Sequence, residues 1–343
     1  MSDCRIAEKT AFLTTETLSA IISPQQLYLE EELLSIEGAD FIMRNWSGPA
    51  PERSLKIGSD EHKNLFCRML LETHNPYKPA VIEWPVLAPD AKQRVMSLPI
   101  WDIAIQTEGR ASIRVKTFAA MITDPLLRSA LEMDAGEEAR HKIVLSKLVQ
   151  AYGIELAPEP EYPVPRDAEW AWLVTGYSEC VDSFFAFGLF EVARRSGYFP
   201  PELIETFEPV MQEETRHILF FVNWAAWHRR TLAWWRRPWF IFKSCAVWIF
   251  LIWERIGIAR GIDQKGEMQD ANFAMNGADQ IGVAIEPPAL IELCLAENDR
   301  RMAGYDGRLL RPAAVPMLAR LALRLLTAHQ KLLEYRRRDR RAE

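Results

Sequence analysis

The sequence predicts an all-α protein built around a four-helix bundle with one long crossover. Apolar residues recur along the chain with the 3.6-residue period of a helix, and no clear run alternates apolar and polar residues as a strand does. Two long helical hairpins, at 99–153 and 167–230, are separated by a proline-rich connection. A pair of hairpins joined in this way is typical of a bundle with a single crossover. Further helices are expected before and after the bundle.

Residues 1–98 predict an N-terminal extension of short helices that packs on the bundle. Proline- and glycine-containing stretches break this region, including "NWSGPAPERS" and "NPYKPAVIEWP". One helix is expected in "SDEHKNLFCRMLLETH", because Ser59 is a suitable N-cap and acids occupy the first turn.

The bundle itself is predicted to span residues 99–230. Its first hairpin consists of helices at 99–122 and 125–152, with Pro125 in the first turn and Gly153 as a stop signal. The second hairpin consists of helices at 167–197 and 200–230. The connection between the hairpins must cover about 39 Å if the second and third helices run side by side. Some 14 extended residues can span roughly 46 Å, so the crossover is long enough.

Composition limits the classes of function. The chain has 343 residues and a formal net charge of −6, which gives no reason to expect a nucleic-acid partner. Its five cysteines contain no CxxC pair, so neither a disulfide framework nor a thiolate metal site is indicated. The polar N-terminus "MSDCRIAEKT" lacks the apolar core of a signal peptide. We therefore expect a cytoplasmic location.

One motif occurs twice, as "GEEARH" at 136–141 and as "QEETRH" at 212–217. In each copy a glutamate and a histidine are three residues apart, so Glu138 with His141 and Glu214 with His217 share a helix face. Chance alone would give roughly 0.6 Glu-x-x-His matches in a chain of this composition. Two copies with the same flanking Glu and Arg, each in the second helix of a hairpin, favour a functional origin. The alternative is that both copies lie on exposed helix faces and form ordinary ion pairs.

A dinuclear metal site in a bundle requires a carboxylate from each of the two remaining helices. The first helix offers Glu108, the only acid between Asp102 and Asp124, 30 residues before Glu138 (138 − 108). Asp182 is the preferred acid of the third helix, 32 residues before Glu214 (214 − 182), and Glu179, one turn earlier, is the second choice. The predicted catalytic and metal-binding residues are Glu108, Glu138, His141, Asp182, Glu214 and His217. Four carboxylates and two imidazoles suit two iron ions, with manganese or a mixed iron–manganese pair left open.

These residues resemble the ferritin-like di-iron carboxylate proteins. "EEARH" and "EETRH", with Glu108 and Asp182 in matching places, are similar in particular to the acyl-carrier-protein desaturases and the aerobic cyclase of chlorophyll synthesis. The resemblance covers about 99–228, and Asp182 stands where that family usually has glutamate.

The resemblance also implies roles for the other motif residues. Glu213 would hold His141, and Glu137 would hold His217, as a carboxylate commonly orients a metal-bound histidine. Arg140 and Arg216 could then neutralise these two acids, or alternatively form salt bridges at the surface.

The expected function is that of an O2-dependent non-haem di-iron oxidase or oxygenase. Hydroxylation, desaturation and N-oxygenation of a small-molecule substrate all remain open, and an external electron donor is expected because nothing marks a flavin or NAD site. The alternative is iron handling, as a ferroxidase, storage protein or peroxide scavenger. A metal-free scaffold is a third class. The remaining histidines lack acids at ligand spacing and are excluded from the site: His62, His74, His228 and His329.

The C-terminal extension, 231–343, begins with an aromatic and basic helix. Residues 229–260 contain five tryptophans and seven basic residues but one acid, Glu254. The longest uncharged run, 244–253, is too short to span a membrane. Two interpretations stay open for 231–260. The helix is buried against the bundle or in a homodimer interface, or it lies on an anionic membrane surface at the inner face of the membrane, which would favour an apolar or lipid-like substrate.

Overall fold

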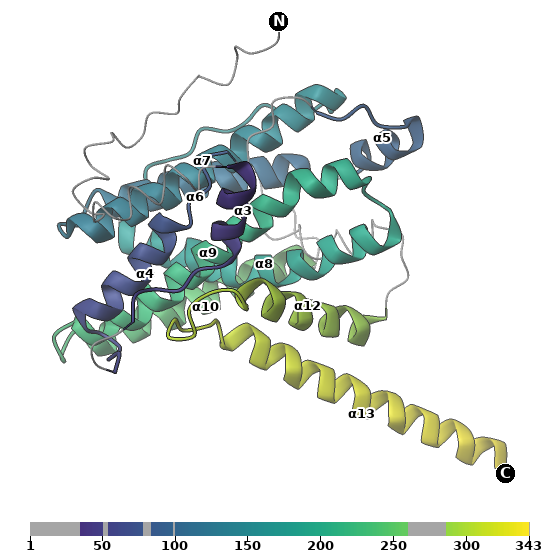
Figure 1. Ribbon diagram of the computed structural model, residues 1–343. Helices are drawn as coiled ribbons and strands as arrows, with labels where there is room; N and C mark the ends of the chain where they lie inside the picture. The colour runs from purple at the N-terminus through teal and green to yellow at the C-terminus, as the bar shows by residue number, and fades with distance from the viewer. Residues whose placement is uncertain (1–34, 51–53, 78–83, 99, 260–285, 343) are drawn as a thin grey trace, which may run out of the picture.

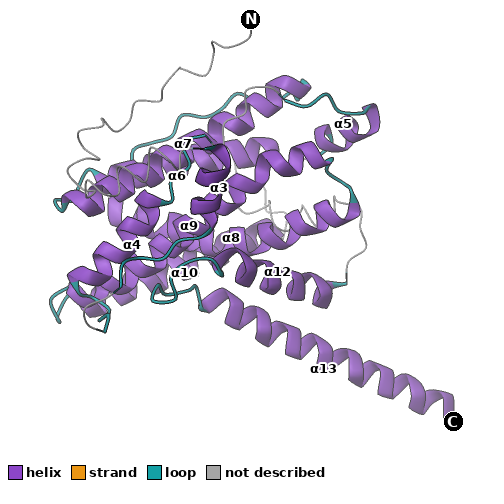
Figure 2. Ribbon diagram, in the orientation of Figure 1, coloured by secondary structure: helices purple, strands orange, loops and turns teal. Residues whose placement is uncertain are grey.

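The computed structural model describes residues 35–50, 54–77, 84–98, 100–259 and 286–342 of the chain. These residues form helices and loops without a strand, apart from an isolated bridge between Trp46 and Tyr305 (Figure 2). The all-α prediction is therefore confirmed for the described part. The helices are α3 (Ile36–Arg44), α4 (Asp60–Glu72), α5 (Pro89–Met96), α6 (Trp101–Ala119), α7 (Pro125–Tyr152), α8 (Ala168–Ser196), α9 (Pro201–Thr231), α10 (Arg237–Ala259), α12 (Pro287–Met302) and α13 (Ala314–Ala342).

Local sequence signals set the ends of the long helices. The side chain of Asp124 caps α7 by accepting a hydrogen bond from a first-turn amide, and Asp167 caps α8 in the same way. Both helices end at a glycine in the left-handed conformation, Gly153 with φ 68° and Gly197 with φ 67°. The predicted helix ends in this region agree with the structure to within three residues.

The four long helices α6, α7, α8 and α9 pack side by side (Figure 1). α6 contacts α7 along its length and also contacts α8, while α9 contacts α8 and α7. Aromatic side chains fill part of the space between them, including Phe118, Trp172 and Trp224. The connection at 154–166 is extended, and the ring of Tyr162 lies against Gly109 of α6. A Cβ atom at Gly109 would lie 2.6 Å from this ring, so only glycine allows the approach.

The flanking helices pack directly on these four. α4 contacts α7 and α9, α12 contacts α8, and α10 lies against α8 and α9. α13 projects away from the other helices toward the C-terminus (Figure 1). Among the described residues, no helix combines the length and the hydropathy needed to cross a membrane.

Candidate metal centre

The two motifs meet between α7 and α9. The side chains of Glu138 and His141 on α7 and of His217 on α9 are buried, and Glu214 is nearly so. The imidazole rings of His141 and His217 have centroids 5.8 Å apart. The alternative that the motifs lie on exposed helix faces is therefore wrong.

Each histidine is held by the acid that precedes the glutamate of the opposite motif. His141 Nε2 lies 2.8 Å from Glu213 Oε2, and His217 Nε2 lies 2.8 Å from Glu137 Oε2. These hydrogen bonds confirm the crossed pairing implied by the resemblance. Because a carboxylate accepts the proton on Nε2, the lone pair of Nδ1 is left for a further partner in both rings.

The motif arginines pair with these same two acids. Arg216 is fully buried, and its Nη1 donates to both carboxylate oxygens of Glu137 at 2.8 and 2.9 Å. Arg140 Nη2 donates to Glu213 Oε1 at 2.6 Å, and its side chain is 22% exposed. The expected neutralisation of Glu137 and Glu213 is confirmed, and the alternative of surface salt bridges does not apply to Arg216.

The Nδ1 atoms face a continuous group of carboxylates. Around His141, ligand atoms of Glu108, Glu138 and Glu214 all lie within 4.8 Å of one another and of the imidazole. Around His217, the same limit is met by Glu179 with Glu214, and by Asp134 with Glu138. Glu138 and Glu214 thus belong to the surroundings of both histidines. His217 Nδ1 lies 2.9 Å from Glu138 Oε1, and His141 Nδ1 lies 3.1 Å from Glu214 Oε1. Neither Nδ1 atom makes a hydrogen bond within the described residues.

Asp182 is not part of this group, which corrects the order of preference on α8. Its carboxylate accepts hydrogen bonds from Arg255 of α10 at 2.6 and 2.7 Å and from Ser178 at 2.7 Å. The second choice, Glu179, lies next to His217 and Glu214 instead. The two acids are one turn apart on the same helix, and the shorter side chain is the one bound to α10. The other five predicted residues are brought together.

Two further residues of the site were not predicted. Asp134 lies on α7 one turn before Glu138 and is fully buried, with neither carboxylate oxygen hydrogen-bonded within the described structure. Its i, i+4 spacing from Glu138 is a signal that the sequence does contain. His74, which follows α4, contacts Glu137 Oε1 through Nδ1 at 2.6 Å. No short-range pattern points to that contact, because the two residues are 63 positions apart.

Burial and mutual repulsion disfavour negative charge on the carboxylates of the group. Burial, together with the charges of Glu214 and Glu108, raises the pKa of Glu138 well above its ordinary value. Burial and the neighbouring acids also raise the pKa of Glu179 well above normal and that of Asp134 to about 6. A bound cation would relieve this repulsion.

The pKa values of the two histidines and of Glu137 are shifted in the directions that favour ion pairs. Burial opposes charge on His141 and His217, but the surrounding carboxylates outweigh it and raise the pKa of both well above the usual value. Burial likewise opposes charge on Glu137, but Arg216 and His217 hold the pKa of that carboxyl well below its ordinary range. Glu137 therefore remains an anion that orients His217.

The donor set fits a metal ion. Buried atoms without a hydrogen bond in the described residues converge here: Asp134 Oδ1 and Oδ2, Glu138 Oε1, His141 Nδ1, Glu179 Oε1 and Oε2, and His217 Nδ1. Buried polar atoms are normally satisfied, so this concentration indicates that a ligand completes the site. Oxygen donors with two imidazoles are the type that iron and manganese accept. The buried Glu and His side chains can therefore hold a metal ion.

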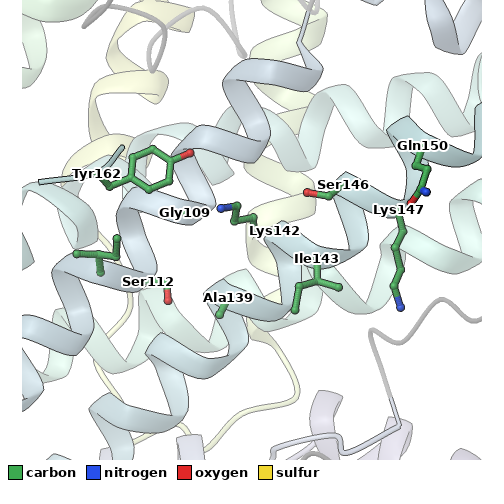
Figure 3. A pocket seen from close by; sticks show the side chains of 10 residues that line it. Gly109, Ser112, Ala139, Lys142, Ile143, Ser146, Lys147, Gln150 and Tyr162 are labelled. Atoms are coloured by element: carbon green, nitrogen blue, oxygen red, sulfur yellow. The ribbon is translucent and has the colours of Figure 1, made fainter. Parts of the chain in front are cut away.

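A separate pocket of about 440 Å³ lies on the outer side of α6 and α7 (Figure 3). It is lined by Gly109 and Ser112 of α6, by α7 side chains including Lys142 and Ser146, and by Tyr162 of the connection. None of the ligand candidates lines it. Its lining residues Gly109 and Lys142 are next to Glu108 and His141 in sequence.

Comparison with protein-family models, curated proteins and solved structures finds no match to this chain. Its class therefore rests on its own geometry. That geometry is an all-helical protein with a buried cluster of carboxylates and imidazoles able to hold a metal ion.

Proposed function

We propose that the chain is a ferritin-like di-iron carboxylate enzyme, an O2-dependent oxidase or oxygenase that acts on a small organic substrate. The observation that carries the proposal is the crossed arrangement of the two motifs. Each histidine is fixed by the acid of the other motif, and both Nδ1 atoms face shared carboxylates. An ordinary buried ion-pair network would satisfy these atoms rather than leave them without hydrogen bonds.

The residues divide between two metal positions. Glu108 and His141 would hold one ion, and Glu179 and His217 would hold the other. Glu138 and Glu214 would bridge the ions, because each belongs to the surroundings of both histidines. Asp134 adds a carboxylate on the His217 side alone. Manganese at one position is compatible with the same donors.

Two bound iron ions would supply two electrons for the reduction of O2 next to a substrate bond. The protein controls access and proton placement. Asp134, Glu138 and His217 are buried, whereas the Glu108 side chain is 18% exposed. Substrate and O2 would therefore approach from the Glu108 and His141 side, while the His217 side excludes water. Glu213 and Glu137 keep the protons of the imidazoles on Nε2, away from the metal.

The test is anaerobic loading with Fe(II), followed by metal counting and O2 admission. We expect two iron ions per chain, and the loss of one or both in His141→Ala and His217→Ala. His228→Ala is the matched control, because His228 lies on α9 but pairs with Glu169 outside the site. The proposal would be refuted if the wild-type chain did not bind iron in a fixed ratio of ions to chain.

Oxygen consumption separates the two functional classes. An oxygenase consumes O2 repeatedly when substrate and a reductant are present. A ferroxidase consumes O2 in proportion to added Fe(II), whatever organic compound is supplied, and this result would favour the alternative function.

A further inference from the structure

The outer side of α10 is an apolar surface that the described chain leaves uncovered. Nine large apolar residues on this helix and the turn before it are exposed: Trp234, Trp235, Trp239, Ile241, Phe242, Ile249, Phe250, Ile252 and Trp253. We call these nine residues the α10 surface. Exposed apolar patches of this extent mark interaction sites in most proteins.

The opposite side of α10 is fixed to the long helices. Phe240, Val247 and Leu251 are buried against them. Lys243 pairs with Asp167 and Glu169, and Arg255 pairs with Asp182. Lys243 and Arg255 thus form ion pairs with α8 and the residue that caps it. These contacts leave the α10 surface facing outward.

Positive charge borders the α10 surface near the start of the helix. Arg229, Arg230 and Arg236 are exposed there. Residues 229–259 contain one acid, Glu254, which is half-buried beside Arg255. The region is basic although the chain as a whole carries a net charge of −6.

We propose that the α10 surface docks onto an anionic membrane, with α10 lying in the headgroup layer. Tryptophan prefers the interface between water and hydrocarbon, where its ring is apolar and its N–H remains solvated. A helix that exposes apolar side chains, with arginines at the border of the exposed face, can bind such an interface without spanning it. The bordering arginines would contact the anionic headgroups. This proposal does not depend on the metal centre.

Charge complementarity favours a membrane over a second copy of the chain. A twofold contact places the same patch on both subunits, so the arginines would need acids within that patch. Glu254 is the single acid of residues 229–259, and it already lies next to Arg255. A layer of anionic lipid supplies the missing counter-charge.

The test is co-sedimentation of the full chain with phosphatidylglycerol–phosphatidylcholine vesicles and with phosphatidylcholine vesicles alone. We expect binding to the anionic vesicles that weakens as salt is raised. The triple variant Trp239→Ser, Phe242→Ser, Trp253→Ser should reduce the partition coefficient by at least about 100-fold, since each side chain would lose its apolar contact with the membrane. The double variant Arg229→Gln, Arg236→Gln should reduce it roughly 25-fold.

The matched control replaces three equally exposed apolar residues elsewhere, in the triple variant Phe41→Ser, Met121→Ser, Val164→Ser. It should bind vesicles like the wild type, and circular dichroism should show unchanged helix content in every variant. Failure of the wild type to bind anionic vesicles would overturn the proposal, as would full binding by the Trp239 triple variant. Sedimentation equilibrium provides a third outcome. If the wild type forms a dimer and does not bind vesicles, and the Trp239 triple variant is a monomer, then the α10 surface is the interface with a second copy of the chain.

Discussion

The two Glu-Glu-x-Arg-His motifs share four of five letters but occupy different surroundings. Glu137, in the first motif, is 1% exposed and forms hydrogen bonds with three basic side chains: Arg216, His217 and His74. Arg140 also approaches it, to 3.7 Å. Glu213, in the second motif, contacts His141 and Arg140, and Arg140 is partly exposed. Both acids are buried, and the difference lies in the arginine that each one binds: Arg216 at Glu137 is fully buried, whereas Arg140 at Glu213 is partly exposed.

Helix α4 is responsible for this difference. It packs on both α7 and α9, and the residues at its end supply the additional contacts. The Thr73 hydroxyl accepts a hydrogen bond from Arg216 at 2.7 Å, and the Leu70 carbonyl accepts another. At the second motif, Arg140 Nη1 donates a hydrogen bond to the backbone carbonyl of Asn75 at 3.2 Å. The repeated motif thus provides the candidate ligands and the acids that orient them, while its unrepeated neighbours determine how each acid is bound.

The largest expected effect comes from replacing the two arginines. Arg216→Met leaves Glu137 as a buried anion with reduced compensation and should lower the free energy of unfolding by about 3–5 kcal/mol. Arg140→Met should cost roughly 1–2 kcal/mol, because its site is partly solvated and one hydrogen-bonded pair is lost. Urea denaturation of both metal-free variants measures the difference. Equal losses would show that the two networks are equivalent.

The second prediction concerns the ligand on α8. Glu179→Gln should weaken metal binding at the His217 position by about 100-fold. Loss of a residue that only orients a ligand costs about 10–100-fold, and loss of a ligand should reach the upper end of that range. Asp182→Asn should retain both metal ions, because Asp182 is bound to Arg255. Anaerobic Fe(II) titration of the two variants decides between the acids. Normal titration by Glu179→Gln and loss of iron in Asp182→Asn would restore the preference drawn from sequence.

The third prediction concerns Asp134, which has no counterpart near His141. Asp134→Asn conserves volume and should reduce iron affinity by about tenfold to 100-fold at one position only. Mössbauer spectra of iron-loaded protein should show a change in the signal of one iron site while the other stays constant. A change in both signals would mean that Asp134 acts on the whole cluster rather than on the His217 side.

The helices and the motif ligands could be predicted because their determinants are local. Asp124 and Gly153 define α7 through contacts within one turn, and the spacing of Glu138 and His141 alone places both on one face. The choice between Asp182 and Glu179 could not be made in this way. It depends on Arg255, which lies 73 residues beyond Asp182 in sequence.

The same limit applies to α10 and to α4. A helix that is apolar on nearly all sides has the pattern of a buried helix, and only its packing reveals that one side is uncovered. His74 lacks an acid at ligand spacing and was excluded from the site, yet tertiary packing brings it to Glu137. Asp134 is a different case. The sequence gives its spacing from Glu138, but only the structure shows that Asp134 is buried.

The smallest effect is expected at His74, where the two motifs differ by a single hydrogen bond. His74→Ala removes one of the three basic partners of Glu137 and leaves Arg216 and His217 in place, so the cost should be about 1 kcal/mol of unfolding free energy. Because Glu137 orients His217 and not His141, any change in metal affinity should fall on the His217 position. Urea denaturation and Fe(II) titration of the variant measure both effects. A larger change at the His141 position would mean that the two crossed pairs act as one unit. The difference between the partners of Glu137 and those of Glu213 would then have no consequence for metal binding.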